Sequence, residues 1–169
     1  SYSVSKVAAE RLSHCYHHKY DLPVVSVRPF NIYGPLQVGE GAIHIFVRNA
    51  VNNDDIFIDG NGSQVRAWCY IEDFIEGVMG CIKNRKGAVG KVFNLGNPGA
   101  AVNMTKLAKK IVEITGSGSK IRFRDNARTD IQYRGPDISR ARKILSFRPS
   151  VSLDSGLKRT ISWYRENPV

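Results

Sequence analysis

The chain opens with Ser1-Tyr2-Ser3-Val4-Ser5-Lys6, and this stretch decides how the rest of the sequence is interpreted. Helix-favouring residues follow it and apolar residues recur at helical spacing, which predicts a helix from residue 2 to about 19. On that helix the Tyr2 phenol and the Lys6 ammonium share one face, about one turn apart. A nearby ammonium favours the phenolate, so such a phenol can accept and return a proton near neutral pH. Because Tyr-x-x-x-Lys is a short pattern, chance placement on an amphipathic helix is the alternative.

Four further stretches follow in a fixed order. They are Val27-Arg28-Pro29-Phe30-Asn31, Gly62-Ser63-Gln64-Val65-Arg66, Phe93-Asn94-Leu95-Gly96-Asn97 and Arg134-Gly135-Pro136-Asp137-Ile138. Together with Tyr2 and Lys6, they make the chain resemble the extended short-chain dehydrogenase/reductase family. Within it, the resemblance is to the NAD-dependent branch of nucleotide-sugar epimerases, dehydratases and decarboxylases, over essentially the whole chain.

The resemblance implies an α/β fold: the C-terminal part of a Rossmann-like parallel sheet plus a smaller mixed α/β substrate-binding region. We expect residues 1–35 and about 88–100 to belong to the NAD-binding domain, and residues of about 36–87 and 101–169 to bind the nucleotide sugar. The Gly-x-x-Gly-x-x-Gly turn that holds dinucleotide phosphates in this family does not occur in the sequence. The chain is therefore expected to be the C-terminal half of a longer enzyme and to lack turnover by itself.

Apolar runs and turn residues predict the remaining elements. We expect strands at 24–27, 56–58, 91–96 and 120–124, an extended run from 64 to 70, and helices at 42–52, 72–84, about 104–115, about 137–145 and from 152 onward.

Composition is that of a globular domain, with 42% hydrophobic and 24% charged residues. No uncharged apolar run approaches ~20 residues, so we expect no membrane span, and no signal peptide is found. Cys15, Cys69 and Cys81 are odd in number and form no C-x-x-C motif, which indicates buried free thiols of a reducing compartment. These features together predict a cytoplasmic protein.

The chain is basic, with a formal net charge of +10 and a pI of about 9.7. The charges are scattered over predicted helices without interleaved aromatic residues, which argues against a nucleic-acid partner. The excess can instead attract an anionic substrate such as a nucleotide-diphosphate sugar. His14, His17 and His18 lie on one helix and cannot all converge on one ion, so we expect no metal site.

The resemblance assigns the catalytic pair and the cofactor contacts. Tyr2 matches the residue that takes the proton of the sugar hydroxyl, and Lys6 matches the lysine that assists it and binds the nicotinamide ribose. Pro29 and Phe30 match residues whose backbone lies against the nicotinamide of NAD. They follow a predicted buried strand, at the end where open α/β sheets place their active sites.

The substrate contacts come from the same resemblance. Asn31, Arg66 and Arg134 match residues that hold the diphosphate, although a turn-forming asparagine and solvated arginines are the alternatives. A guanidinium suits the role because its paired donors match phosphate oxygens. Asp73 matches an acidic position that fixes the arginine strand, with helix capping as the alternative. Relatives often carry an aromatic or aliphatic residue at the position of Asp59, near the nucleotide base, so base recognition departs from the family here.

Three hypotheses about function follow. The resemblance implies a UDP-glucuronate decarboxylase or a UDP-sugar 4-epimerase that acts through a 4-keto sugar, with a dTDP-glucose 4,6-dehydratase as the next alternative. The resemblance also implies a homodimer formed through the helix that carries Tyr2 and Lys6. A hypothesis of another class is a non-catalytic module that binds a partner or a nucleotide.

Overall fold

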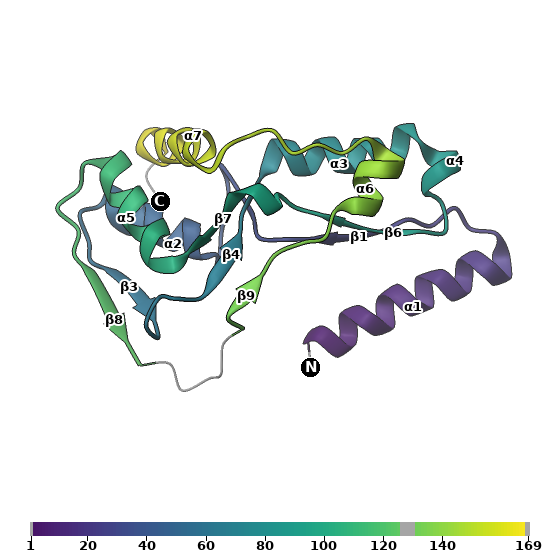
Figure 1. Ribbon diagram of the computed structural model, residues 1–169, viewed down its shortest axis with the longest axis horizontal. Coiled ribbons are helices and arrows are strands. Elements are labelled where there is room, and N and C mark those ends of the chain that lie inside the picture. Colours follow the sequence, from purple (N-terminus) through teal and green to yellow (C-terminus); the bar gives the residue numbers. More distant parts are fainter. Residues whose placement is uncertain (1, 126–130, 168–169) are drawn as a thin grey trace.

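The computed structural model describes residues 2–125 and 131–167 (Figure 1). The helices are α1 (Tyr2–Tyr20), α2 (Ala42–Val51), α3 (Ile71–Lys83), α4 (Arg85–Ala88), the 3-10 helix η1 (Pro98–Ala100), α5 (Met104–Thr115), α6 (Ser139–Leu145) and α7 (Leu153–Glu166). The strands are β1 (Ser26–Pro29), β2 (Ile32–Tyr33), β3 (Ile56–Asp59), β4 (Val65–Ala67), β5 (Cys69–Tyr70), β6 (Val92–Leu95), β7 (Ala101–Asn103), β8 (Ile121–Arg124) and β9 (Tyr133–Arg134). The mixed α/β class expected from the sequence is confirmed.

Strands β1 and β6 form a parallel pair in which Ser26 lies opposite Val92. Helices α3 and α6 cover one face of this pair (Figure 1), where Phe93, Leu95 and Ala141 are fully buried. The pairing joins the two segments that we expect in the NAD-binding domain. Helices α3 and α6, whose residues we assign to the substrate-binding region, also contribute to this core, and the division of the chain stays a prediction.

Helices α2, α5 and α7 pack around a second and larger core (Figure 1). Each helix contributes two fully buried aliphatic residues four positions apart, which is one helical face. The pairs are Ile43 and Val47, Leu107 and Ile111, and Leu157 and Ile161. The helical spacing of apolar residues in the sequence therefore predicts which faces of these helices are buried.

Capping residues set the ends of two of these helices. Asn103 accepts a hydrogen bond from the Lys106 amide at 2.8 Å, and Ser152 does the same for Ser155 at 3.2 Å. Gly116 ends α5 at φ 65°, a left-handed conformation that glycine adopts without strain. The predicted boundaries of α5 and the predicted start of α7 are confirmed.

Most residues of helix α1 are exposed, and none of its residues, all of which the structure describes, is buried. Val4, Val7 and Leu12 remain 72%, 60% and 59% exposed. An ion pair at 2.6 Å between Glu10 and Arg28 ties the helix to β1. Such an apolar surface suits a further segment or a second copy, and the dimer contact through α1 stays a prediction. Although α1 is 19 residues long, neither it nor any other helix within 2–125 and 131–167 is apolar enough to cross a membrane.

The three cysteines are free, but only two are buried. Burial raises the pKa of the Cys69 thiol to about 12, which keeps it protonated and unreactive. Cys15 lies on α1 and is exposed. The expectation that all three are buried is therefore wrong for Cys15, because α1 packs against so little of the described chain.

His44 is a buried polar group in the larger core, only 5% exposed. Its Nδ1 lies 2.5 Å from the Tyr164 hydroxyl, which donates to the Gln37 carbonyl at 2.6 Å. Because the hydroxyl has one proton and gives it to Gln37, Nδ1 of His44 is the donor to Tyr164. Burial, with a smaller contribution from Arg48, lowers the pKa of His44.

We expect this depressed pKa to make stability depend on pH. The fold favours neutral His44, whereas the unfolded chain takes up the proton near pH ~6.5. The contribution is therefore complete above that pH and is lost progressively as the pH falls further. Urea unfolding at pH 7.5 and 5.5 should show a smaller loss of unfolding free energy in His44→Gln than in wild type. His18→Gln, which removes an exposed imidazole, should keep the wild-type difference; equal differences in all three proteins would contradict the assignment.

Candidate functional site

A pocket of about 780 Å³ lies between α2, β3, β4 and β8. Its lining includes Asn31 and Arg66, two of the residues predicted to bind substrate, together with Asp59 and Arg124. Asn31 comes two residues after the end of β1, so the pocket opens beyond the carboxyl end of a parallel strand. This is the position at which open α/β sheets bind their ligands.

Asn31 is fixed at the pocket by its backbone and its side chain. Its φ of 44° is in the left-handed region, which asparagine tolerates better than most residues. Its Nδ2 donates to the Ala67 carbonyl at 2.8 Å, and its own carbonyl accepts from the Cys69 amide at 3.1 Å. These bonds tie the end of β1 to the segment that carries Arg66, which explains why the two predicted residues meet.

Arg66 is 9% exposed and is held by backbone carbonyls. Its Nη1 donates to Val65 at 2.9 Å and to Ile131 at 2.6 Å. Strand β9 runs parallel to β4 and places Arg134 directly opposite Arg66. Arg134 is exposed and does not line the pocket, although the strand register sets its backbone opposite that of Arg66.

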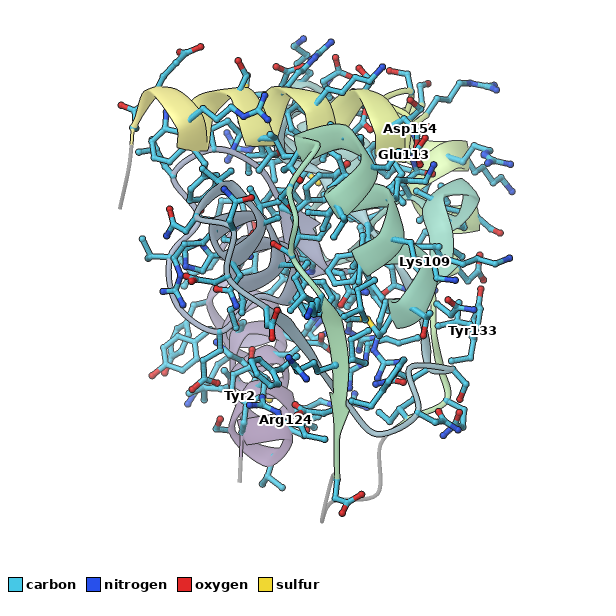
Figure 2. The ribbon with its side chains drawn as sticks, turned by 90° about the vertical axis from the view of Figure 1, so that its left-hand side faces the viewer. Tyr2, Lys109, Glu113, Arg124, Tyr133 and Asp154 are labelled. Atoms are coloured by element: carbon cyan, nitrogen blue, oxygen red, sulfur yellow. The ribbon has the colours of Figure 1, made fainter. Side chains whose placement is uncertain are left out.

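The wall of the pocket at β3 and β8 combines an aromatic ring with an ion pair. Phe57 and Asp59 are the two exposed residues of β3 and share one face. Arg124 lies opposite Asp59 in the ladder, and its Nε donates to Asp59 Oδ1. Figure 2 shows Arg124 near the free end of its strand. Sequence reasoning missed Arg124, since no local pattern reveals which strand pairs with β3.

Two other pocket residues carry buried polar atoms without a partner among the described residues. They are the Trp68 indole Nε1, a donor, and Gln37 Oε1, an acceptor. A buried polar atom without a partner costs about 1–3 kcal/mol. The lining thus retains hydrogen-bonding capacity in addition to that of Asn31 and Arg66.

Tyr2 and Lys6 lie together but outside this pocket. Lys6 Nζ is 5.5 Å from the centroid of the Tyr2 ring, and both side chains are exposed on the first turns of α1. Helix α1 runs beneath β1 and β6, with its N-terminal end on the side of β9 (Figure 1), and Tyr2 marks that end in Figure 2. The structure therefore confirms the shared helix face and places the pair apart from Asn31 and Arg66.

Pro29 is the last residue of β1, which ends two residues later than predicted, and Phe30 follows it. The prediction that this strand is buried is wrong, because its first two residues are half-buried and its last two are exposed. Phe30 continues the ladder, since its amide donates to the Leu95 carbonyl at 2.9 Å. Gly96 allows the close packing at this point: a Cβ there would lie 2.8 Å from both Phe30 Cβ and Pro136 Cγ. The absence of a side chain at position 96 thus brings the segment after β9 against the carboxyl ends of β1 and β6.

Asp73 differs from the other predicted substrate residues. It is 1% exposed in the first turn of α3 and does not line the pocket. Its carboxylate accepts hydrogen bonds from the Ser150 amide at 2.9 Å and the Val151 amide at 3.1 Å. These contacts fix the chain before α7, so the pocket gives no support to the predicted contact with substrate.

We expect Asp73→Ala to lower the free energy of unfolding by about 3 kcal/mol, because the partly buried hydrogen bonds from the Ser150 and Val151 amides lose their buried acceptor. Urea unfolding measures this change. The matched control is Asp154→Ala, which removes an exposed carboxylate paired with Lys110 at 2.8 Å and should change stability by less than about 1 kcal/mol. Equal effects of the two substitutions would show that the buried contacts contribute little.

A sequence model described as the NAD dependent epimerase/dehydratase family matches residues 1–96, more than half of the chain. The UDP-glucuronate 4-epimerase of Thermodesulfobacterium geofontis is 32% identical over 167 residues, which are 98% of this chain and 50% of that protein. UDP-glucuronic acid decarboxylase 4 of Arabidopsis thaliana is 35% identical over 98% of this chain and 37% of its own length. The chain thus spans about half the length, or less, of these curated relatives.

Solved structures of relatives also match nearly the whole of this chain but only about half of their own length. The crystal structure of UDP-glucuronic acid 4-epimerase from Bacillus cereus, in complex with UDP-glucuronic acid and NAD, matches with a TM-score of 0.91 and 28% identity. The match covers 98% of this chain and 52% of that one. The fold described here is therefore that of about half of the epimerase.

Proposed function

The chain belongs to the NAD-dependent epimerase/dehydratase family, and we propose that it forms the C-terminal half of an enzyme that modifies a nucleotide sugar. The inferred substrate is a UDP-sugar, and the inferred reaction is decarboxylation of UDP-glucuronate or 4-epimerisation of a UDP-sugar. The observation that carries this proposal is the pocket beyond β1, which gathers Asn31 and Arg66. Relatives whose names state these two activities support it.

The pocket suits a diphosphate. Arg66 offers a planar set of donors that can bind two phosphate oxygens, and the Asn31 amide is fixed at the same pocket. Arg134, opposite Arg66 in the parallel ladder, adds a second guanidinium within reach of a bound anion. The net charge of +10 attracts such a ligand over longer distances.

Part of an NAD site falls within this chain. A phenol and an ammonium on one exposed helix face fit the hydroxyl groups of a nicotinamide ribose, because both can donate hydrogen bonds to them. Tyr2 and Lys6 would hold that ribose, with the backbone of Pro29 and Phe30 against the nicotinamide. When bound, NAD⁺ supplies a hydride acceptor for the sugar carbon and returns the hydride later.

The residues of the chain then have distinct tasks. Tyr2 takes the proton of the sugar 4-hydroxyl, and Lys6, whose Nζ lies 5.5 Å from the centroid of the Tyr2 ring, assists it. The resulting 4-keto group lies β to the carboxylate of a glucuronate, which can then leave as carbon dioxide. In an epimerase the same ketone is reduced from its other face, and Tyr2 returns the proton to the oxygen. Asn31, Arg66 and Arg134 hold the diphosphate throughout.

The test is turnover by the complete protein with NAD⁺ and, separately, UDP-glucuronate, UDP-galactose and dTDP-glucose, with products identified by NMR. We expect conversion of a UDP-sugar and no turnover by the 169-residue chain alone. Conversion of dTDP-glucose only would instead identify the dehydratase alternative. Binding of UDP without any conversion would favour the non-catalytic module.

A further inference from the structure

The segment of residues 34–41 connects β2 to α2 and forms part of the wall of the pocket, and we call it the pocket loop. Three of its residues line the pocket: Gln37, Glu40 and Gly41. Its apolar residues Leu36 and Val38 remain 75% and 80% exposed. These two side chains therefore contribute little burial to hold the loop in place.

The backbone of the pocket loop is folded tightly. Leu36 has φ 62° and Gly39 has φ 87°, and residues with a Cβ rarely adopt the first of these conformations. The Gln37 side chain folds back over Gly41, where a Cβ would lie 2.2 Å from Gln37 Nε2. Such a conformation persists only when contacts from the surrounding structure hold it.

The C-terminal helix α7 supplies such a contact, from 127 positions further along the chain. The hydroxyl of Tyr164, a residue only 3% exposed, donates a hydrogen bond to the Gln37 carbonyl at 2.6 Å. His44 Nδ1, on α2, donates to the same hydroxyl at 2.5 Å, which directs the hydroxyl proton toward Gln37. The Trp163 ring packs edge-on against the Tyr164 ring, with centroids 4.9 Å apart, and α7 lies against α2 (Figure 1). The phenol is thus fixed on several sides.

Neither Tyr164 nor His44 lines the pocket, so each acts on a ligand only through the loop. We propose that Tyr164, oriented by His44, is a positioning residue that holds the pocket loop as one wall of the ligand site. Helix α7 thereby sets the affinity for the ligand without contacting it. This inference rests on the proposed function, because it takes the pocket to bind a nucleotide sugar.

The test is Tyr164→Phe in the complete protein, which removes the hydroxyl and keeps the ring. A glutamate-specific protease reports opening of the loop by its rate of cleavage after Glu40, and calorimetry reports the affinity for UDP. Loss of one hydrogen bond should make cleavage about 5-fold to 10-fold faster, because the loop opens more often. The affinity for UDP should fall by a similar factor, since the closed loop is the state that binds.

The same helix carries a matched control. Thr160 is fully buried, and its Oγ1 donates to the Gly156 carbonyl at 2.8 Å. Thr160→Val removes a buried hydroxyl from α7, as Tyr164→Phe does, but this hydroxyl does not bond to the loop. It should lower the free energy of unfolding without changing cleavage after Glu40 or the affinity for UDP. Equal effects of the two substitutions on both readouts would overturn the inference, because general destabilisation would explain them.

Two substitutions at His44 test the orientation of the phenol. An asparagine amide nitrogen lies the same number of bonds from the backbone as histidine Nδ1 and can donate to Tyr164, whereas alanine has no donor. We expect His44→Asn to bind UDP within about 2-fold of wild type and His44→Ala to bind it about 5-fold more weakly. Equal weakening in both variants would contradict the orienting role of His44.

Cleavage of the loop is measured without ligand, which separates failure of this inference from failure of the proposed function. A wild type that binds no UDP would refute the proposed function. Unchanged cleavage after Glu40 in Tyr164→Phe would overturn the holding role of Tyr164, whether or not UDP binds. Faster cleavage with unchanged affinity for UDP would also overturn the inference, because the loop would then not form part of the ligand site.

Discussion

Tyr2→Phe is expected to lower turnover of the complete protein by about 10³-fold, within the 10²–10⁴-fold range of lost general acid–base catalysis. The substitution removes only the hydroxyl. The ring, and with it the contact to Lys6 Nζ at 5.5 Å, is retained. Because Tyr2 is 72% exposed and does not line the pocket, neither stability nor the affinity for UDP should change. Turnover, UDP affinity and urea unfolding of the same preparation measure the three quantities.

The same helix provides a closely matched control. Tyr20 is exposed at the other end of α1 and has Lys19 Nζ 5.2 Å from its ring centroid. Tyr20→Phe therefore removes an identical hydroxyl beside an identical cation and should leave turnover unchanged. Turnover of Tyr2→Phe within about 3-fold of wild type would remove Tyr2 from its proposed role, and an equal loss in Tyr20→Phe would attribute the effect to the helix instead.

The long helices were predictable because each carries its own local signal. Helix α5 shows this best: Leu107 and Ile111 mark its buried face, Asn103 caps its start and Gly116 ends it. Strands β2, β5 and β9 have only two residues each, which is too short for an alternating pattern to be recognised. Their existence depends on pairing with strands that are distant in the sequence, and the four-residue helix α4 is similarly too short to show a helical period.

In the candidate site, too, residues with a local sequence signal were predictable and residues placed by distant pairing were not. Asn31 and Arg66 were predicted from motifs, and the structure brings them to one pocket. Arg124 was not predicted, because it reaches the pocket only through the pairing of β8 with β3. Arg124 and its partner Asp59 lie 65 positions apart in the sequence. Asp73 resembled a site residue in the sequence, yet its environment is set by the chain near Ser150, which no local pattern links to it.

Arg66→Lys is expected to weaken binding of UDP by about 30-fold, or ~2 kcal/mol. Lysine keeps the charge but loses the planar set of donors that can bind two phosphate oxygens at once. It also loses the geometry that lets Arg66 donate to the Val65 and Ile131 carbonyls while facing the pocket. Arg134→Lys should cost less, about 3-fold to 5-fold, because Arg134 is exposed and a solvated lysine can still reach an anion. Calorimetry with UDP measures both affinities, and Arg122→Ala, outside the pocket, should not change the affinity.

The kinetic effect of Arg66→Lys should be the opposite of that of Tyr2→Phe. The diphosphate does not change during the reaction, so a residue that holds it stabilises the ground state and the transition state equally. Losing such a contact raises KM and leaves kcat nearly unchanged, whereas losing the proton acceptor lowers kcat with little change in KM. A fall in kcat at constant KM in Arg66→Lys would place Arg66 at the reacting end of the substrate.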